Sequence, residues 1–323
     1  MERRRLLAAA ALLATPGMAS AQQDWPGSRP VRIIHPSVAG GPGDIYTRQL
    51  ADHLSRRLGG TFVVENRVGG TGAIGTAAAA NAPADGWTWL SASNTSHVVA
   101  PLVLRDLPFD PVRQFAAVAG LYRYGMMLIT APRIPAATTA EFVAWARAQP
   151  QGVTLASVGT GSVGHMMAER FRLRAGFPTV HVPYRGGPPA MLAIAQGEAD
   201  YIFDNIGNSG ALLREGKVRG LALTGPARAP QMPEVPTLAE AGFPGFLEEV
   251  WFGLYAPAGM PPALVARMNA ETNRWLETPA IRARMAEAAH VAMPGPPEAM
   301  AGFWAEDRRR WAALVAETGV RIE

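Results

Sequence analysis

The chain has 323 residues, of which 48% are hydrophobic and 17% are charged, so we expect a globular protein rather than a disordered or coiled-coil one. A chain of this length can bury the cores of two domains of ordinary size. The formal net charge of +4 is small, and no dense basic run is interleaved with aromatic residues, so nucleic acid is not an expected partner.

The first 21 residues have the three parts of an export signal. Arg3 to Arg5 form a basic region, Leu6 to Leu13 an apolar region, and Ala19-Ser20-Ala21 a small-residue cleavage site. The apolar run is well short of the roughly 20 residues that span a membrane. We therefore expect residues 1–21 to be removed and a soluble periplasmic protein to begin at Gln22. The signal is compatible with both the secretory and the twin-arginine route. Because the chain contains no cysteine, the exported protein must be stable without disulfide bonds.

Apolar runs and helical patterns alternate from Val31 onward, which predicts an α/β fold with mainly parallel sheets. Residues 91–97 are expected to form a polar loop. The expected strands cover residues 31–35, 62–65, 87–90, 124–130, 153–156, 179–182, 199–203, 218–224 and 249–257. The expected helices cover residues 45–58, 76–80, 139–147, 166–173, 190–196, 262–276, 279–289 and 297–317, with one that ends before Gly216 and a short one at 237–240.

A loop of small residues, Ser157 to His165, joins the expected strand at 153–156 to a helix. Glycines let the backbone approach a ligand closely, and a helix N-terminus offers unpaired N–H groups and a positive dipole end. The loop therefore predicts an anion-binding site, to which its hydroxyl groups would contribute. A second glycine loop, at 36–44, also leads into a helix, and there Asp44 is favoured as an N-cap over a ligand contact.

The pattern G-x-G-x-x-G, which suggests a dinucleotide site, occurs twice, at residues 70–75 and 159–164. In the dinucleotide fingerprint an acidic residue ends the strand that follows, whereas here Asp85-Gly86 is typical of a turn. We therefore expect no nucleotide and no other cofactor.

The sequence also argues against several catalytic sites. A nucleophile elbow needs G-x-S-x-G, but Thr160 stands where the glycine before Ser162 should be, so an exported hydrolase is a less favoured alternative. The six histidines show no zinc-binding spacing, and no metal site is expected. For His165, packing or capping is favoured over ligand contact. Asp204 has two equally weighted interpretations, a cap of the next helix or an acceptor for a ligand ammonium or hydroxyl.

Several short motifs occur in a fixed order along the chain. They are Pro30 to Asp44, Val64-Glu65-Asn66-Arg67, Asp85-Gly86-Trp87-Thr88, Ser157-x-Gly-x-Gly-Ser, His181-Val182-Pro183-Tyr184, Gly197-x-x-Asp200, Pro233-x-x-Pro236-Thr237 and Trp251-x-Gly253. In their joint order, which covers nearly the whole mature chain, these motifs resemble the Bug receptors, the periplasmic solute-binding proteins of the tripartite tricarboxylate transporter family.

The resemblance implies a two-lobed periplasmic-binding-protein fold of the venus-flytrap, type II-like kind, with two mixed, mainly parallel sheets. Lobe 1 would comprise residues 22–124 and 250–323, and lobe 2 residues 125–249. The implied function is capture of a small organic carboxylate between the lobes and its delivery to an integral membrane permease, by a monomer without enzymatic activity. A ligand-sensing receptor that docks on a membrane sensor protein is an alternative that sequence does not separate.

In such a fold, loops at the C-terminal ends of strands from both lobes face the ligand. Residues 37–39 are Ser-Val-Ala where the family more often has Phe-Ala-Pro, which leaves the shape of that wall open. The ligand-binding residues expected on this basis are Val38, Ala39, Gly40, Gly41, Asp44, Asn94, Thr95 and Ser96 in lobe 1, and Ser157, Gly159, Thr160, Gly161, Ser162, His165, Tyr184 and Asp204 in lobe 2.

Overall fold

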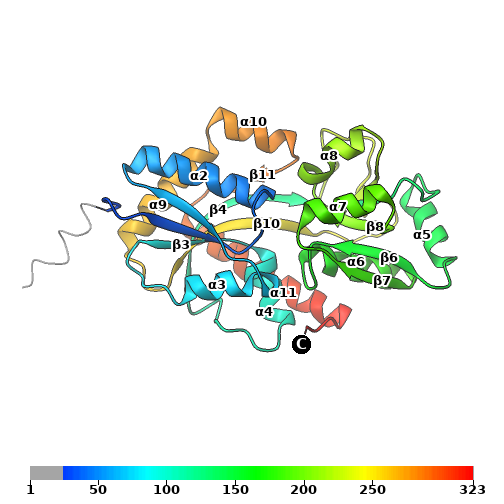
Figure 1. Cartoon of the computed structure of the whole chain (residues 1–323), viewed down its shortest axis with the longest axis horizontal. Helices are drawn as coiled ribbons and strands as arrows, with labels where there is room; N and C mark the ends of the chain where they lie inside the picture. The colour runs from blue at the N-terminus through cyan, green and yellow to red at the C-terminus, as the bar shows by residue number, and fades with distance from the viewer. Residues whose placement is uncertain (1–24, 323) are drawn as a thin grey trace, which may run out of the picture.

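The computed structural model describes residues 25–322, so the expected export signal lies outside the described residues. Two mixed sheets, each with helices packed on it, lie end to end in the elongated molecule (Figure 1). The six-stranded sheet has the order β11-β4-β10-β3-β1-β2, and the five-stranded sheet the order β7-β6-β8-β5-β9. We call the six-stranded sheet with its helices lobe 1, and the five-stranded sheet with its helices lobe 2.

Lobe 1 combines parallel and antiparallel pairing. Strand β1 runs parallel to β2 and β3, whereas β10 runs antiparallel to β3 and β4. Its strands are β1 (Val31–His35), β2 (Phe62–Asn66), β3 (Thr88–Ser93), β4 (Phe115–Gly125), β10 (Glu249–Pro257) and β11 (Val291–Ala292). Its helices are α2 (Pro42–Leu58), α3 (Ala73–Ala80), α4 (Ala100–Val103), α9 (Pro262–Leu276), α10 (Pro279–Glu287) and α11 (Pro297–Thr318), with the short helices η1 (Gly70–Gly72) and η2 (Thr95–Val99).

Lobe 2 is likewise mixed. Strand β6 runs parallel to β7 and β8, whereas β5 runs antiparallel to β8 and β9. Its strands are β5 (Met127–Thr130), β6 (Val153–Ser157), β7 (Thr179–Pro183), β8 (Tyr201–Asp204) and β9 (Arg219–Leu223), and its helices are α5 (Thr139–Arg147), α6 (Val163–Ala175), α7 (Gly187–Gln196) and α8 (Ile206–Arg214).

Local sequence accounts for many of these bounds. In α2, Leu50 and Leu54 recur at helical spacing and are fully buried against the sheet. The helix stops at Gly59, whose φ of 77° is the left-handed conformation that glycine adopts without strain. In α5, Thr138 and Glu141 form a capping box that pairs the first N–H groups of the helix.

Three sequence-based expectations were wrong in detail. The single strand expected at 124–130 is the end of β4 and all of β5, which belong to different sheets because the chain leaves lobe 1 there. Residues 237–240 form a turn rather than a helix. Thr237 pairs with β9, and the Glu240 carboxylate binds the Thr237 N–H at 2.7 Å as in a capping box, but no helix follows. The polar loop at 91–97 is the end of β3 followed by η2.

The chain passes between the lobes twice, and Thr224 joins the two passages. Its buried hydroxyl accepts a hydrogen bond from the Met126 N–H at 2.8 Å and donates one to the Glu248 carbonyl at 2.6 Å. The backbone of Thr224 pairs with the same two residues, at 2.8 and 3.0 Å. One residue therefore fixes the outgoing strand against the returning one. That the parts on either side, divided at 124/125 and 249/250, move as separate lobes stays a prediction.

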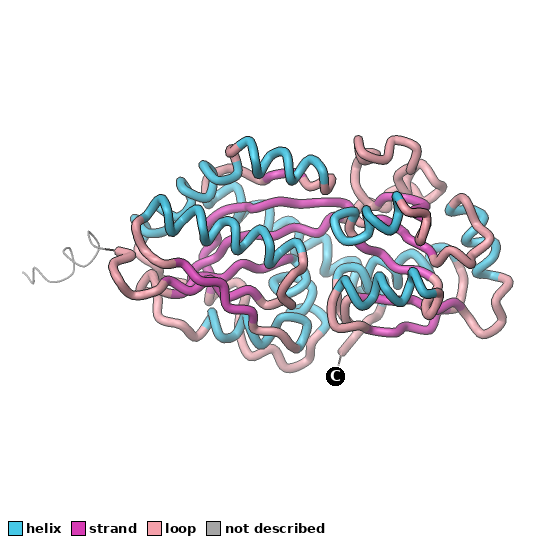
Figure 2. The backbone as a smooth tube through the Cα atoms, turned by 45° about the horizontal axis from the view of Figure 1, so that its top comes forward, coloured by secondary structure: helices cyan, strands magenta, loops and turns pink. Residues whose placement is uncertain are grey.

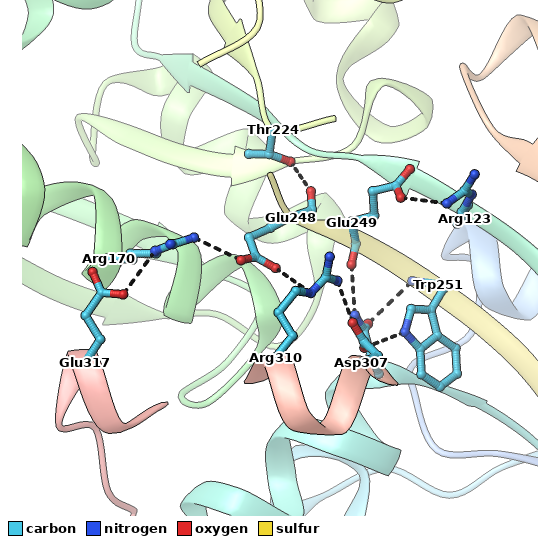
Figure 3. A network of polar contacts seen from close by, with 10 residues as sticks. Arg123, Arg170, Thr224, Glu248, Glu249, Trp251, Asp307, Arg310 and Glu317 are labelled. Atoms are coloured by element: carbon cyan, nitrogen blue, oxygen red, sulfur yellow. Dashed lines mark hydrogen bonds and ion pairs between the residues drawn. The ribbon is translucent and has the colours of Figure 1, made fainter. Parts of the chain in front are cut away.

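A partly buried ion network lies beside this joint and connects the lobes (Figure 3). The Glu248 carboxylate receives Arg170 of α6 at 2.9 Å and Arg310 of α11 at 3.6 Å. Arg170 also reaches Glu317 of α11 at 3.3 Å. Burial raises the pKa of Glu248 to about 7, against the opposing effect of Arg310 and Arg170. A helix of lobe 2 is thus bound to the last helix of lobe 1 on the outer side of the joint.

The elements are arranged in layers around each sheet. The tube view shows helices on both sides of the strands of lobe 1, while β4 and β10 extend toward lobe 2 (Figure 2). Within residues 25–322, no helix combines the length and the apolar character needed to cross a membrane.

The joint at Thr224 yields a test with an internal control. Thr224→Val keeps the shape but leaves the Met126 N–H and the Glu248 carbonyl without their side-chain partner, so the free energy of unfolding should fall by about 1–3 kcal/mol. Thr130 in β5 is equally buried, but its hydroxyl has no partner within the described residues, so Thr130→Val should leave that free energy unchanged or raise it. Urea unfolding of both variants measures the difference, and equal losses would contradict the assigned role of Thr224.

Candidate functional site

A cavity of about 710 Å³ lies between the two lobes. It is bordered by the loops that follow β1, β2 and β3 in lobe 1, by those that follow β6, β7 and β8 in lobe 2, and by the strands that join the lobes. Because β1–β3 run parallel, as do β6–β8, the cavity lies at the carboxyl ends of both parallel sets. This is the place where α/β sheets commonly hold ligands.

The floor of the cavity is apolar and comes from the joining strands. Tyr124, Met126, Val250 and Phe252 border it. The Phe252 ring stacks on Tyr122 with centroids 5.0 Å apart. Because Tyr122 does not border the cavity, this contact supports the Phe252 ring from the protein interior. Phe252 and Met126 are both buried, and both also form part of the cavity surface.

His35 forms another part of the wall and carries no charge there. Its ring lies beside Phe252 with centroids 6.0 Å apart, and its Nδ1 donates to the Ser91 carbonyl at 3.1 Å. Burial lowers the pKa of His35 to about 4. The imidazole is therefore neutral near pH 7 and offers no cation for an acid.

Two helices begin at the cavity without a capping side chain. Helix α2 begins after Gly41 and helix α7 after Gly186, and neither N-cap makes a side-chain hydrogen bond. Within residues 25–322 the backbone N–H groups of Gly43, Asp44 and Gly187 have no acceptor, and they therefore remain for a ligand. Gly43, Asp44 and Gly187 all border the cavity. These two helix starts give a positive partial charge from both lobes.

The start of α6, in contrast, is already occupied. The Ser162 hydroxyl accepts from the His165 N–H at 3.3 Å, and the Val163 N–H donates to Thr95 of lobe 1 at 3.3 Å. The loop at 157–165, which the sequence predicted to bind an anion, therefore already uses several of its hydrogen-bond donors in contacts within the protein. Ser162 and Thr95 still border the cavity.

Asp44 is a structural residue of the first glycine loop. It occupies the third helical position rather than the N-cap, which corrects the expected capping role. Its carboxylate accepts from the Gly40 N–H at 3.0 Å, from Arg48 at 3.0 Å and from Asn66 at 2.9 Å. Burial alone would raise its pKa, but these three partners together hold the pKa below its usual value.

Asp204 ends β8 and reaches the cavity from lobe 2. Its Oδ1 accepts from the Asn205 N–H at 2.8 Å, and the Asn208 amide reaches both oxygens at 3.3 Å. Burial, opposed by these hydrogen bonds, raises the pKa of Asp204 to about 6. The N-cap of α8 is Asn205, whose side chain accepts from the Asn208 N–H at 2.9 Å, so Asp204 supports this cap and is not itself the cap. That Asp204 accepts a ligand ammonium or hydroxyl stays a prediction.

The structure places some of the expected ligand-binding residues at the cavity and the others elsewhere. Those that border the cavity are Val38, Gly41, Asp44, Thr95, Ser96, Gly159, Ser162, Tyr184 and Asp204. Those that do not border it are Ala39, Gly40, Asn94, Ser157, Thr160, Gly161 and His165. Direct ligand contact by any of these residues stays a prediction.

Polar contacts within the protein explain why several residues turn away. Asn94 donates to the Glu249 carbonyl at 2.9 Å, and the Ser157 hydroxyl lies 2.7 Å from His181 Nε2. His165 accepts the Gly161 N–H at 3.1 Å and stacks on His181 with centroids 3.9 Å apart. The packing role favoured for His165 agrees with this geometry.

Sequence reasoning missed one wall of the cavity. Val68, Gly69, Thr71 and Gly72, from the loop after β2, border it, although that glycine loop was noticed and its position after a predicted strand was a usable signal. Thr71 also donates to the carbonyl of Thr160 in lobe 2 at 2.8 Å. The lobes therefore touch directly beside the cavity.

No metal centre forms in the part of the chain that the structure describes, where three or more histidine or acidic side chains nowhere come together to hold an ion. The cavity itself contains one arginine, Arg185, against two aspartates. Its capacity for an anion thus rests mainly on backbone N–H groups and hydroxyls.

Comparisons with known proteins agree with this geometry. A family model described as "Tripartite tricarboxylate transporter family receptor" (TctC) matches residues 46–320. Protein BugT from Bordetella pertussis is 32% identical over 326 residues, which cover 100% of both chains. The structure of R. palustris Rpa4515 with adipate has 30% identity and a TM-score of 0.88, covering 92% of this chain and 99% of that one. MatC (Rpa3494) from Rhodopseudomonas palustris with bound malate has 30% identity and a TM-score of 0.83, with 89% and 99% covered.

The comparisons confirm the two-lobed α/β fold that the motifs implied. The family match covers residues 46–320, which include every strand of both sheets except β1, and BugT matches over the whole length of both chains. The chain therefore belongs to TctC, the receptor family of the tripartite tricarboxylate transporters.

Proposed function

We propose that this protein binds a small organic carboxylate between its lobes in the periplasm and delivers it to an integral membrane permease of the tripartite tricarboxylate transporter type. The observation that carries the proposal is the cavity between the lobes, to which α2 and α7 present uncapped N-termini. Such helix starts favour anions. Rpa4515 with adipate and MatC with malate are relatives whose ligands are carboxylates.

Contact of one ligand with both lobes would couple ligand binding to closure of the protein. A carboxylate that contacts the start of α2 in lobe 1 and of α7 in lobe 2 gains full binding energy only when the lobes are close, so it shifts the population toward the closed form. The structure already contains two contacts between the lobes beside the cavity, Thr71 with the Thr160 carbonyl and Val38 with Gly186. A permease can distinguish the closed surface from the open one. A membrane sensor could recognise the same change. Capture of a permease from membranes by the liganded protein would support the transport role over the sensor role.

Hydrolysis receives no support from the groups beside the cavity. The Ser162 hydroxyl accepts a hydrogen bond from the His165 backbone, while His165 Nδ1 accepts from the Gly161 N–H. The imidazole is therefore not placed as a base for that serine, as a nucleophile would require. We infer a receptor that releases its ligand unchanged.

A thermal-shift screen of residues 22–323 against small carboxylates should identify stabilising acids. A ligand at 100 times its dissociation constant adds ~2.7 kcal/mol to the native state. The protein should first be unfolded and refolded, so that a co-purified ligand is removed. If no carboxylate shifts the melting curve of well-folded protein, the proposed function is wrong.

Gly41 offers a sharper test, because its φ of −75° suits any residue and a Cβ there meets open space. Gly41→Asp would place a carboxylate on the start of α2, where it caps the N–H groups that the ligand needs. We expect acid affinity to fall at least about tenfold, while stability stays equal or rises by about 1 kcal/mol. Gly41→Ala adds the same Cβ without the charge and is the control. Isothermal titration measures both variants, and equal affinities would exclude this helix start from the site.

A further inference from the structure

The Asp204 carboxylate has hydrogen-bonding capacity that the protein does not use. A carboxylate offers about four acceptor positions. Oδ1 receives the Asn205 N–H at 2.8 Å and the Asn205 side-chain amide at 3.1 Å, and the Asn208 amide reaches it at 3.3 Å. Oδ2 receives, within the described residues, only the long contact from Asn208 at 3.3 Å. This second oxygen therefore keeps unused acceptor capacity, and it belongs to a residue that borders the cavity.

The charge of Asp204 is also left without a cation. Asp44, the other carboxylate of the cavity, is paired with Arg48 at 3.0 Å. Asp204, which is 2% exposed, is held by neutral amide donors alone in the described part of the chain. A buried carboxylate without a cationic partner is costly, and a donor group of a ligand would relieve that cost.

The surroundings of Asp204 decide what kind of ligand fits beside it. Tyr124, Met126 and Phe252 form a largely apolar floor that includes one phenol hydroxyl, and Arg185, the cation of the cavity wall, is exposed. A second carboxylate on a ligand would meet a like charge in this region and find no buried cation to offset it. An ammonium or hydroxyl group would instead complete the hydrogen bonding of Oδ2.

We propose that Asp204 accepts a hydrogen bond from an ammonium or hydroxyl group of the ligand and so selects monocarboxylates that carry such a donor on an apolar body over dicarboxylates. The inference rests on the proposed function, because it assumes that the ligand carboxylate is bound elsewhere in the same cavity. The uncapped starts of α2 and α7 supply that second position. Asp204 is thus a specificity residue of the carboxylate site.

Acids of matched length test this selection on the wild-type chain. Isothermal titration at pH 8 would compare 6-aminohexanoate, 6-hydroxyhexanoate, hexanoate and adipate, and then 4-aminobutanoate, butanoate and succinate. Within at least one length, the amino or hydroxy acid should bind at least about tenfold more tightly than the dicarboxylate and the plain acid. A dicarboxylate that binds as tightly or more tightly at both lengths would overturn the selection and leave the carboxylate receptor intact. If no acid binds, the proposed function fails and the selection fails with it.

A variant assigns the effect to Asp204 itself. Asp204→Asn should weaken binding of the preferred amino or hydroxy acid at least about tenfold and bring the dicarboxylate of that length level with it. The control is Glu234→Gln, which removes an exposed acid elsewhere in lobe 2 and should change neither affinity. An unchanged preference in folded Asp204→Asn would remove the residue from the site. Should that variant not fold, the wild-type series alone decides between the two outcomes.

Discussion

The hydroxyl of Thr224 is the interaction on which the arrangement of the two lobes depends. It accepts from Met126 on the outgoing strand and donates to Glu248 on the returning one, so both passages are held in one register. The same strands then supply Tyr124 and Phe252 to the cavity floor. The joint and the cavity floor therefore belong to the same pair of chain segments. A movement of the lobes at the joint would change the distance between the cavity loops of lobe 1 and those of lobe 2.

Charge is distributed unequally on the two sides of this joint. Away from the cavity, the Glu248 carboxylate contacts Arg170 of lobe 2 and Arg310 of lobe 1, so charged groups link the two lobes there. On the cavity side, His35 is neutral and Asp204 is held, within the described residues, by amide donors alone, so the cavity offers mainly dipoles and hydrogen-bond groups. A receptor must release what it binds, and partial charges of helix starts bind anions more weakly than a buried guanidinium would.

Sequence patterns predicted the elements well wherever local signals were sufficient. Strand β10 and helix α9 were placed at their observed bounds, because a long apolar run and a proline-started helical pattern are local features. The chain was expected to leave lobe 1 near residue 124, but the break between β4 and β5 within the strand expected at 124–130 was missed, since one apolar run serves two sheets. Contacts between residues far apart in the sequence could not be predicted either, since nothing near Ser157 in the sequence indicates that its hydroxyl binds His181. The position of the cavity was thus predictable, but the choice between a residue that faces it and one that turns away was not.

The most direct test of a receptor that closes on its ligand is the distance between the lobes. The chain has no cysteine, so Ile74→Cys in lobe 1 and Leu192→Cys in lobe 2, both exposed positions, can carry a pair of spin labels. Pulsed electron paramagnetic resonance then measures the distance distribution with and without a saturating carboxylate. The account predicts that the acid shifts the distribution to one short, narrow population. A distribution that stays unchanged at saturation would contradict capture between the lobes.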